Sequence, residues 1–273
     1  MVWYTWRRHR LGLAGVGLLA LAVTAVATIM TASGRSPDTV RLAQQALPLL
    51  AGVVLGVPLF AREREHGLHR LTLGRTPTRS RWLLAPIATL LLPVLLGTGL
   101  LVALYTPAAY SELRWYDEGR YALTGLVPFG HVTFALVLGA VAGLVLGRTV
   151  PALVATVVGA LGMRIAVGVA LPSLWPHRTR LLPLESMSLG AAEAWGRDIG
   201  LMRADGTRTD FRATSCSLSD VPCLNADGLV ARYVSEIPAS SSAALPAVEF
   251  AIFVVLAALM LGGALAWTRH RAF

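Results

Sequence analysis

Six apolar runs of about 20 residues each constrain this chain more than any other feature of its sequence. A helix of about 20 residues is long enough to cross roughly 30 Å of hydrocarbon, and 55% of the chain is hydrophobic. We therefore expect an all-α polytopic membrane protein with six transmembrane helices. The predicted spans cover residues 11–32, 42–60, 83–106, 125–147, 150–171 and 246–267.

Residues 1–10, ahead of the first span, combine three aromatic side chains with three arginines. This composition is typical of a short helix lying in the membrane interface. A cleaved signal peptide is the alternative for this end. The apolar run that follows is 22 residues long, whereas the apolar region of a signal peptide has about 7–15 residues. We therefore expect an interfacial helix followed by a retained membrane anchor.

The distribution of arginine predicts the orientation of the spans. Short segments on one side carry 12 arginines against two glutamates, and the other side carries 11 arginines against 12 acidic residues. The arginine-rich side is predicted to be cytoplasmic, with both termini on it. The net charge of +9 then requires no nucleic-acid partner. The expected organisation is a membrane domain of five spans at 1–171, an extracytoplasmic region at 172–245, and the sixth span with a cytoplasmic tail at 246–273.

All 24 basic residues of the chain are arginine. A phosphate-binding loop of the form GxxxxGK[ST] needs a lysine, so this chain cannot be a P-loop ATPase by itself. The sequence also has no Ser/His/Asp grouping and no dinucleotide-binding fingerprint. We expect no catalytic activity and no cofactor bound by this chain.

The cytoplasmic segment, residues 60–82, separates the second and third spans and holds six arginines, two glutamates and two histidines. On a helical wheel its first half has an apolar arc formed by Gly67, Phe60, Leu71, Leu68 and Ala61. The opposite arc is formed by Glu65, His69, Arg62, His66, Arg70 and Glu63. Only Arg64 falls among the apolar residues. We expect the segment to lie against a surface and turn its charged face toward a partner.

The polar region at 172–245 contains the only two cysteines of the chain, Cys216 and Cys223. A disulfide between them would close a tight loop and fit an oxidising compartment. The alternative is a metal site, which would need further ligands, and the nearest histidine, His177, is far away in sequence. We therefore expect the disulfide.

Two charged residues lie inside predicted spans, where a charge needs a physical reason. Arg164 in the fifth span and Glu249 in the sixth are at similar depths, which predicts an intramembrane ion pair. The pair is either a structural contact or part of a binding or gating site. His131 stands alone in the fourth span, and we expect a hydrogen-bonded packing role for it.

Three glycines, Gly139, Gly143 and Gly147, form a doubled GxxxG ridge on the fourth span. Small residues at this spacing let another helix approach closely. The partner is either a helix of the same chain or a second subunit.

The cytoplasmic segment carries motifs that identify a family. Glu63-Arg64-Glu65-His66-Gly67 is followed by Leu71, Pro77 and Arg79, a run that resembles the segment after the second span in permease subunits of the type-2 ABC exporter family. The chain is most similar to the single-domain permeases common in high-GC bacteria. Those tend to begin with Thr-Trp-Arg-x-x-Arg, as residues 5–10 do, and to contain His-Arg-Leu and Thr-Arg-x-Arg-Trp, as residues 69–71 and 78–82 do. They also have two outer-loop cysteines and a glutamate in the first turn of the last span.

The resemblance implies that the cytoplasmic segment forms a coupling helix seated in a groove of a separate ATPase subunit. Two permeases and two ATPase subunits would then form an exporter in the bacterial plasma membrane, with ATP and Mg²⁺ on the ATPase. The residues implied for the ATPase contact are Glu63, Glu65, His66, Gly67 and Arg70. Binding of anionic lipid is the alternative role of the segment, and it leaves the interleaved glutamates unexplained.

Two other functions remain open from the sequence. One is a membrane-anchored extracytoplasmic binding or sensory protein whose working part is residues 172–245. The other is a secondary transporter, against which the lack of acidic residues deep in the spans is an objection.

Overall fold

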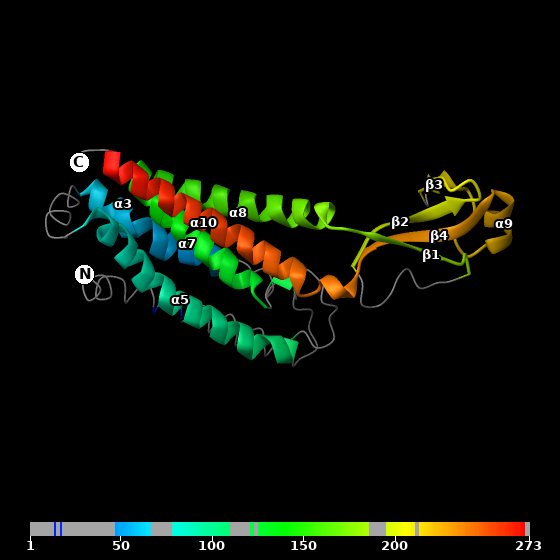
Figure 1. Cartoon of the computed structure of the whole chain (residues 1–273), viewed down its shortest axis with the longest axis horizontal. Helices are drawn as coiled ribbons and strands as arrows, with labels where there is room; N and C mark the ends of the chain where they lie inside the picture. Colours follow the sequence, from blue (N-terminus) through cyan, green and yellow to red (C-terminus); the bar gives the residue numbers. More distant parts are fainter. Residues whose placement is uncertain are drawn as a thin grey trace. The chain divides into compact units, whose positions relative to one another are not determined.

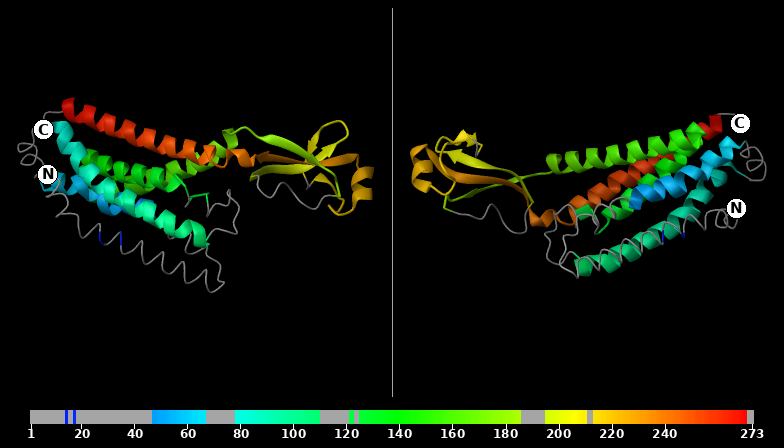
Figure 2. Two further views of the ribbon diagram at one scale, coloured as in Figure 1. Left: turned by 60° about the horizontal axis from the view of Figure 1, so that its bottom comes forward. Right: turned by 180° about the vertical axis from the view of Figure 1, so that it is seen from behind.

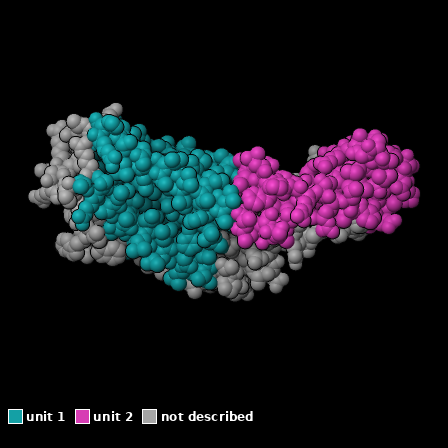
Figure 3. Space-filling model, in the orientation of Figure 1, with its two compact units in different colours: residues 1–113, 117–169, 246–273 teal, residues 114–116, 170–245 magenta. Residues whose placement is uncertain are grey.

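The computed structural model describes residues 14, 17, 47–66, 78–109, 121–122, 125–185, 195–210 and 213–270. The chain divides into two compact units, which Figure 3 shows in different colours. The helical unit comprises residues 1–113, 117–169 and 246–273, and the sheet unit comprises residues 114–116 and 170–245. All of residues 172–245, the polar region of the sequence, fall in the sheet unit.

Four long helices are present among the described residues (Figure 1). They are α5 (Arg79–Ala109), α7 (Val127–Leu146), α8 (Thr149–Leu174) and α10 (Ala244–His270). Each coincides largely with a stretch that is long and apolar enough to cross a membrane: Ser80–Ala103, Val127–Leu146, Thr149–Leu174 and Ala239–His270. These helices confirm a polytopic membrane protein and overlap the predicted third to sixth spans. Apart from Ala14 and Gly17, the first predicted span lies outside the described residues, as does the predicted interfacial helix at 1–10.

The second predicted span is helical and continues past its predicted end at Phe60. Residues 47–50 are α-helical, η1 (Ala51–Gly56) is a π-helix, and α3 (Val57–Glu65) is an α-helix. Pro58 accounts for the π-helix, because proline has no N–H to donate and its ring collides with the carbonyl four residues earlier. The first charged residues of the cytoplasmic segment therefore extend the helix of the second span.

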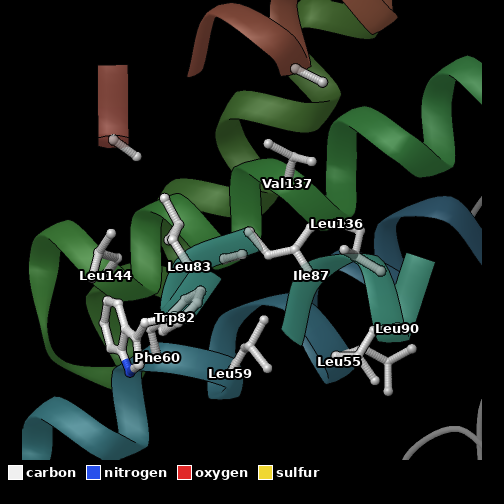
Figure 4. Close-up of a cluster of buried hydrophobic side chains, with 13 residues drawn as sticks. Leu55, Leu59, Phe60, Trp82, Leu83, Ile87, Leu90, Leu136, Val137 and Leu144 are labelled. Carbon is white, nitrogen blue, oxygen red and sulfur yellow. The ribbon is translucent and has the colours of Figure 1, made fainter. Parts of the chain in front are cut away.

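Helix α7 is the innermost of the long helices. In its most apolar 18-residue window 67% of the residues are buried, against 11–22% in the windows of the other three. Its buried side chains pack with those of the second span and of α5 (Figure 4). The largest members of this cluster are Leu55, Leu59, Phe60, Trp82, Leu83, Ile87, Leu90, Leu136 and Leu144. The exposed apolar faces of α5 and α8, with Leu96 and Val158 among their residues, suit a covering of lipid.

Glycines bring α7 close to the second span within one chain. A Cβ on Gly143 would lie 2.5 Å from the carbonyl oxygen of Val57, and a Cβ on Gly56 would lie 2.6 Å from that of Leu136. A Cβ on Gly139 would collide with the backbone of Gly52. Backbones approach this closely because the glycines put no side chain between the two helices.

The sheet unit contains a four-stranded antiparallel sheet in the order β1-β4-β2-β3. The strands are β1 (Arg178–Leu182), β2 (Trp195–Arg203), β3 (Arg208–Thr209) and β4 (Leu229–Ile237). The all-α prediction is therefore wrong for this part of the chain. That prediction rested on the six long apolar runs, and this region lies between the last two of them.

A disulfide and a small core stabilise the part of the sheet unit around α9 (Val221–Ala226). Cys216 and Cys223 are joined, with their Cα atoms 5.8 Å apart. Cys223 lies in α9, whose first turn is capped by Asp220, the carboxylate of which accepts from the Cys223 N–H at 3.2 Å. The buried side chains of Leu184, Leu201, Leu224 and Leu229 form the core against which the disulfide packs.

Candidate functional site

The two aromatic residues that bound the cytoplasmic segment contact each other. The ring centroids of Phe60 and Trp82 are 5.0 Å apart, and both side chains are buried. Figure 4 shows the pair in the cluster that also contains Leu144 of α7. The segment therefore leaves and re-enters the same packed core, and its two ends are held against α7.

Helix α3 turns the first charged residues of the segment in different directions. Arg62, Glu65 and His66 are exposed, whereas Glu63 is only 8% exposed. The structure thus differs from the helical wheel at Glu63, which the wheel puts on the charged face. It agrees with the wheel at Arg64, which lies on the same side of α3 as the buried residues and reaches α7.

His66 marks the end of α3. Its Nδ1 lies 2.8 Å from the carbonyl oxygen of Arg62, which also accepts from the His66 backbone N–H at 3.2 Å. Gly67 and Arg70, the other members of the predicted ATPase contact, lie outside the described residues, as does His69. Across the described ranges, no three His, Cys, Asp or Glu side chains come together as a metal site.

Arg64 binds the C-terminal end of α7. Its Nη1 donates to the carbonyl oxygen of Leu144 and lies 3.5 Å from that of Val145. The guanidinium also lies 5.5 Å from the ring centroid of Trp267 in α10, within the range of a cation–π interaction. Arginine suits this position, because the last carbonyls of a helix lack intrahelical donors and carry partial negative charge.

Glu65 binds the N-terminal end of α8. Its Oε2 accepts from the Thr149 hydroxyl at 2.6 Å, and its Oε1 accepts from the Thr149 backbone N–H at 3.3 Å. The hydroxyl bond, followed by the N–H bond, lowers the pKa of Glu65 below its ordinary value of 4.5. A carboxylate at this end of a helix satisfies a free N–H and complements the helix dipole.

Gly147 ends α7 between these two contacts. Its φ of 64° is the left-handed conformation that favours glycine, and its N–H bonds to the Gly143 carbonyl oxygen at 3.1 Å. A Cβ on Gly147 would lie 3.3 Å from Nε of Arg64. Within the predicted ridge, Gly139 and Gly143 therefore serve helix approach, and Gly147 serves the turn into α8.

A buried polar cluster surrounds Glu249 near the start of α10. Tyr121 Oη donates to Glu249 Oε2 at 2.6 Å, and His131 Nε2 lies 2.9 Å from Glu249 Oε1. His131 and Glu249 are 6% and 4% exposed, respectively. The His131 ring also packs edge-on against Phe253 at 4.6 Å between centroids. Both carboxylate oxygens thus have partners from the helical unit, as a buried carboxylate requires.

Arg164 lines a small cavity together with His131 and Phe253. The cavity measures about 20 Å³, enough for about one water molecule. It is too small to hold an organic cargo. The direct ion pair between Arg164 and Glu249 stays a prediction.

The sheet unit carries an open polar groove of about 460 Å³. Arg208 lies on it, with its Nη2 donating to the Thr179 hydroxyl at 3.2 Å and its guanidinium 5.0 Å from the Tyr233 ring. Tyr233 Oη in turn donates to Asp198 at 3.3 Å. Burial, followed by the negative charge of Asp198, raises the pKa of Tyr233.

Sequence reasoning missed Tyr121 and Thr149 as partners of the predicted site residues. Each is separated by 84 or more positions from the carboxylate that it contacts, so no local pattern connects them. A usable signal existed for His131, because it lies near the outer end of its span, at the depth predicted for Glu249. A second signal was Arg64, a charge on an otherwise apolar helix face.

A family model described as "ABC-2 membrane transporter related" matches residues 23–171, more than half of the chain. No curated protein and no solved structure matches the chain. The matched residues include α3, the cytoplasmic segment and the α7–α8 turn. They end before β1, so the sheet unit lies almost entirely outside the match.

Proposed function

Because the chain belongs to the ABC-2 membrane transporter related family, we propose that it is the transmembrane permease subunit of an ATP-driven exporter. The family match identifies an ABC-2-type permease and is the main support for the proposal. The finer parts of the proposal are the direction of transport and the separate ATPase subunit that binds and hydrolyses Mg-ATP. The absence of lysine supports a separate ATPase, since this chain cannot form a phosphate-binding loop with its own residues.

The cytoplasmic segment is the proposed coupling element. Its two ends contact one another through Phe60 and Trp82, so a force on the residues between them acts on packed helices rather than on free chain. The proposed contact comprises Glu63, Glu65, His66, Gly67 and Arg70. Of these, Glu63 is buried and Glu65 is bound by Thr149, and we therefore assign the principal contact to the other three. Complementary charge would fix how the ATPase subunit aligns with the cytoplasmic segment.

We further propose that two permeases assemble with two ATPase subunits in the bacterial plasma membrane. Both termini and the cytoplasmic segment would face the cytoplasm, and the sheet unit would lie outside. The disulfide between Cys216 and Cys223 supports the outer placement, because disulfides persist in oxidising compartments.

Co-purification tests the ATPase partner. A tagged chain should recover a soluble protein with a GxxxxGK[ST] motif, the product of a neighbouring reading frame. Arg70→Glu should reduce its recovery at least about ten-fold, since like charges at a contact cost several kcal/mol. Arg178→Glu is the matched control, because it makes the same charge change on exposed β1. Recovery that is equal in both variants, or no ATPase with the unaltered chain, would refute the proposal and favour a membrane-anchored binding protein.

Labelling with a membrane-impermeant maleimide tests the orientation. The two native cysteines are paired in the disulfide, so an introduced cysteine supplies the reactive thiol. Ala204→Cys, at the exposed turn after β2, should react in intact cells. Arg75→Cys in the cytoplasmic segment should react only after permeabilisation. The reverse pattern would contradict the proposed topology.

A further inference from the structure

Neighbouring residues at the end of α3 bind the two sides of one turn. Arg64 donates to carbonyls in the last turn of α7, and Glu65 accepts from Thr149 at the start of α8. Gly147 and Arg148 connect the two helices. We call the hydrogen bonds of Arg64 and Glu65 to these helix ends the helix-end contacts.

The charges suit the helix ends that they meet. A helix carries partial negative charge on its terminal carbonyls and partial positive charge on its first N–H groups. Arg64 supplies donors to the first kind of end, and Glu65 supplies acceptors to the second. Exchanging the two residues would place like charge at both ends and leave donors facing donors. The order Arg64-Glu65 therefore fits the direction in which the chain passes from α7 to α8.

Gly147 permits the approach of α3. Its positive φ closes the turn, and a Cβ there would contact the Arg64 side chain tightly, with Nε at 3.3 Å and Cδ at 3.6 Å. Any larger residue would strain the backbone and press on Arg64. Glycine at this position thus leaves room for the Arg64 side chain beside the turn.

We propose that Arg64 and Glu65 are positioning residues that transmit movement of the cytoplasmic segment to α7 and α8. The inference rests on the proposed function, because the movement originates in an ATPase bound to that segment. Helix α3 ends at Glu65, so displacement of the next residues acts first on the helix-end contacts. Since α7 packs against both the second span and α5, a shift of its end reaches most of the helical unit.

The holding function is tested on the permease alone. Nitroxide labels on Arg62→Cys and Arg148→Cys, both at exposed positions, report the separation of α3 from the turn by dipolar broadening. In the double-labelled chain, Thr149→Ser keeps the hydroxyl that Glu65 binds and should keep the broadening. Thr149→Val removes the hydroxyl at similar size and should weaken the broadening. Arg64→Met should weaken it further. Equal broadening in all variants would overturn the proposal.

The transmitting function is tested on the complex with its ATPase. A single nitroxide on Arg148→Cys should change mobility when a non-hydrolysable ATP analogue is added. This change should fall roughly five-fold in Thr149→Val, the effect of about one net hydrogen bond, and persist in Thr149→Ser. Recovery of the ATPase should be equal in both. A purely structural contact would leave the ATP-dependent change intact, and that result would overturn the proposal.

The two experiments separate the possible failures. If no ATPase binds the unaltered chain, the proposed function is wrong, and the transmission inference is overturned with it. The broadening measurement still decides whether the helix-end contacts hold the turn. If the ATPase binds but the variants respond alike to the ATP analogue, the proposed function stands and the inference alone is wrong.

Discussion

Replacing Gly143 by alanine measures how much the close approach of α7 and the second span contributes to stability. The new Cβ would lie 2.5 Å from the Val57 carbonyl oxygen and 3.1 Å from the Ala61 backbone nitrogen. Both are backbone atoms that cannot rotate away, so the helices must separate. Overpacking of this kind costs about 1–3 kcal/mol. Against this, alanine is favoured over glycine in a helix by about 1 kcal/mol.

Gly162→Ala is the matched control for this change. Gly162 lies in the middle of α8, and a Cβ there has no atom within 4 Å. It therefore has the same gain in helix propensity and no collision. The difference between the two variants isolates the cost of the contact, about 1–3 kcal/mol. For a chain of this size, this corresponds to a Tm difference on the order of 2–10 °C, with Gly143→Ala lower.

Thermal unfolding in detergent, followed by tryptophan fluorescence, gives the two Tm values. Size-exclusion chromatography of the same samples reports the assembly state. Equal Tm values in Gly143→Ala and Gly162→Ala would refute the reasoning. If Gly143→Ala instead kept its Tm and lost a dimer, the ridge would serve a subunit interface, the alternative that the sequence leaves open.

Three further results follow from the structure. Cys216→Ser should lower the unfolding free energy of the sheet unit by about 2 kcal/mol in urea titrations, the value for a short closed loop, and the unaltered chain under reducing conditions should match it. Glu249→Ala should destabilise the helical unit by about 1–3 kcal/mol in thermal unfolding, because it leaves buried His131 without its partner, whereas Glu249→Gln should recover much of the loss. The folded-state pKa of Glu65 is lowered below 4.5 by Thr149, so the label broadening at the turn should persist as the pH falls to 4.5 and weaken only below it, with the Arg64 bonds to α7 remaining; a weakening between pH 7 and 5 would contradict this contact.

The long helices of the membrane could be predicted from the sequence because their limits have local causes. The fourth span was expected at 125–147, and α7 extends from Val127 to Leu146. Pro128 suits its first turn, and Gly147 supplies the left-handed residue that ends it. The second span was predicted too short, since hydropathy falls at Arg62 while the helix continues to Glu65. The helix thus continues for several residues after its sequence becomes charged.

The sheet and the polar cluster could not be predicted in the same way. The longer strands have nine residues, and the sheet pairs Trp195 with Ile237, positions far apart in the chain. Hydropathy carries no information about such pairing. The contacts of Glu249 with Tyr121 and His131 likewise join residues 128 and 118 positions apart. The His131 contact arises where α7 packs against α10, and Tyr121 comes from the chain before α7. A single sequence does not encode such packing as a local pattern.

Arg64 shows how a local exception can point to a distant contact. A charge on the apolar side of a helix needs partners, because burying it alone is costly. Here one guanidinium meets a helix end and the Trp267 ring together, which a lysine ammonium could not do with the same geometry. The next residue, Glu65, makes the complementary contact across Gly147. The one residue that broke the amphipathic pattern therefore links the cytoplasmic segment to α7 and α10.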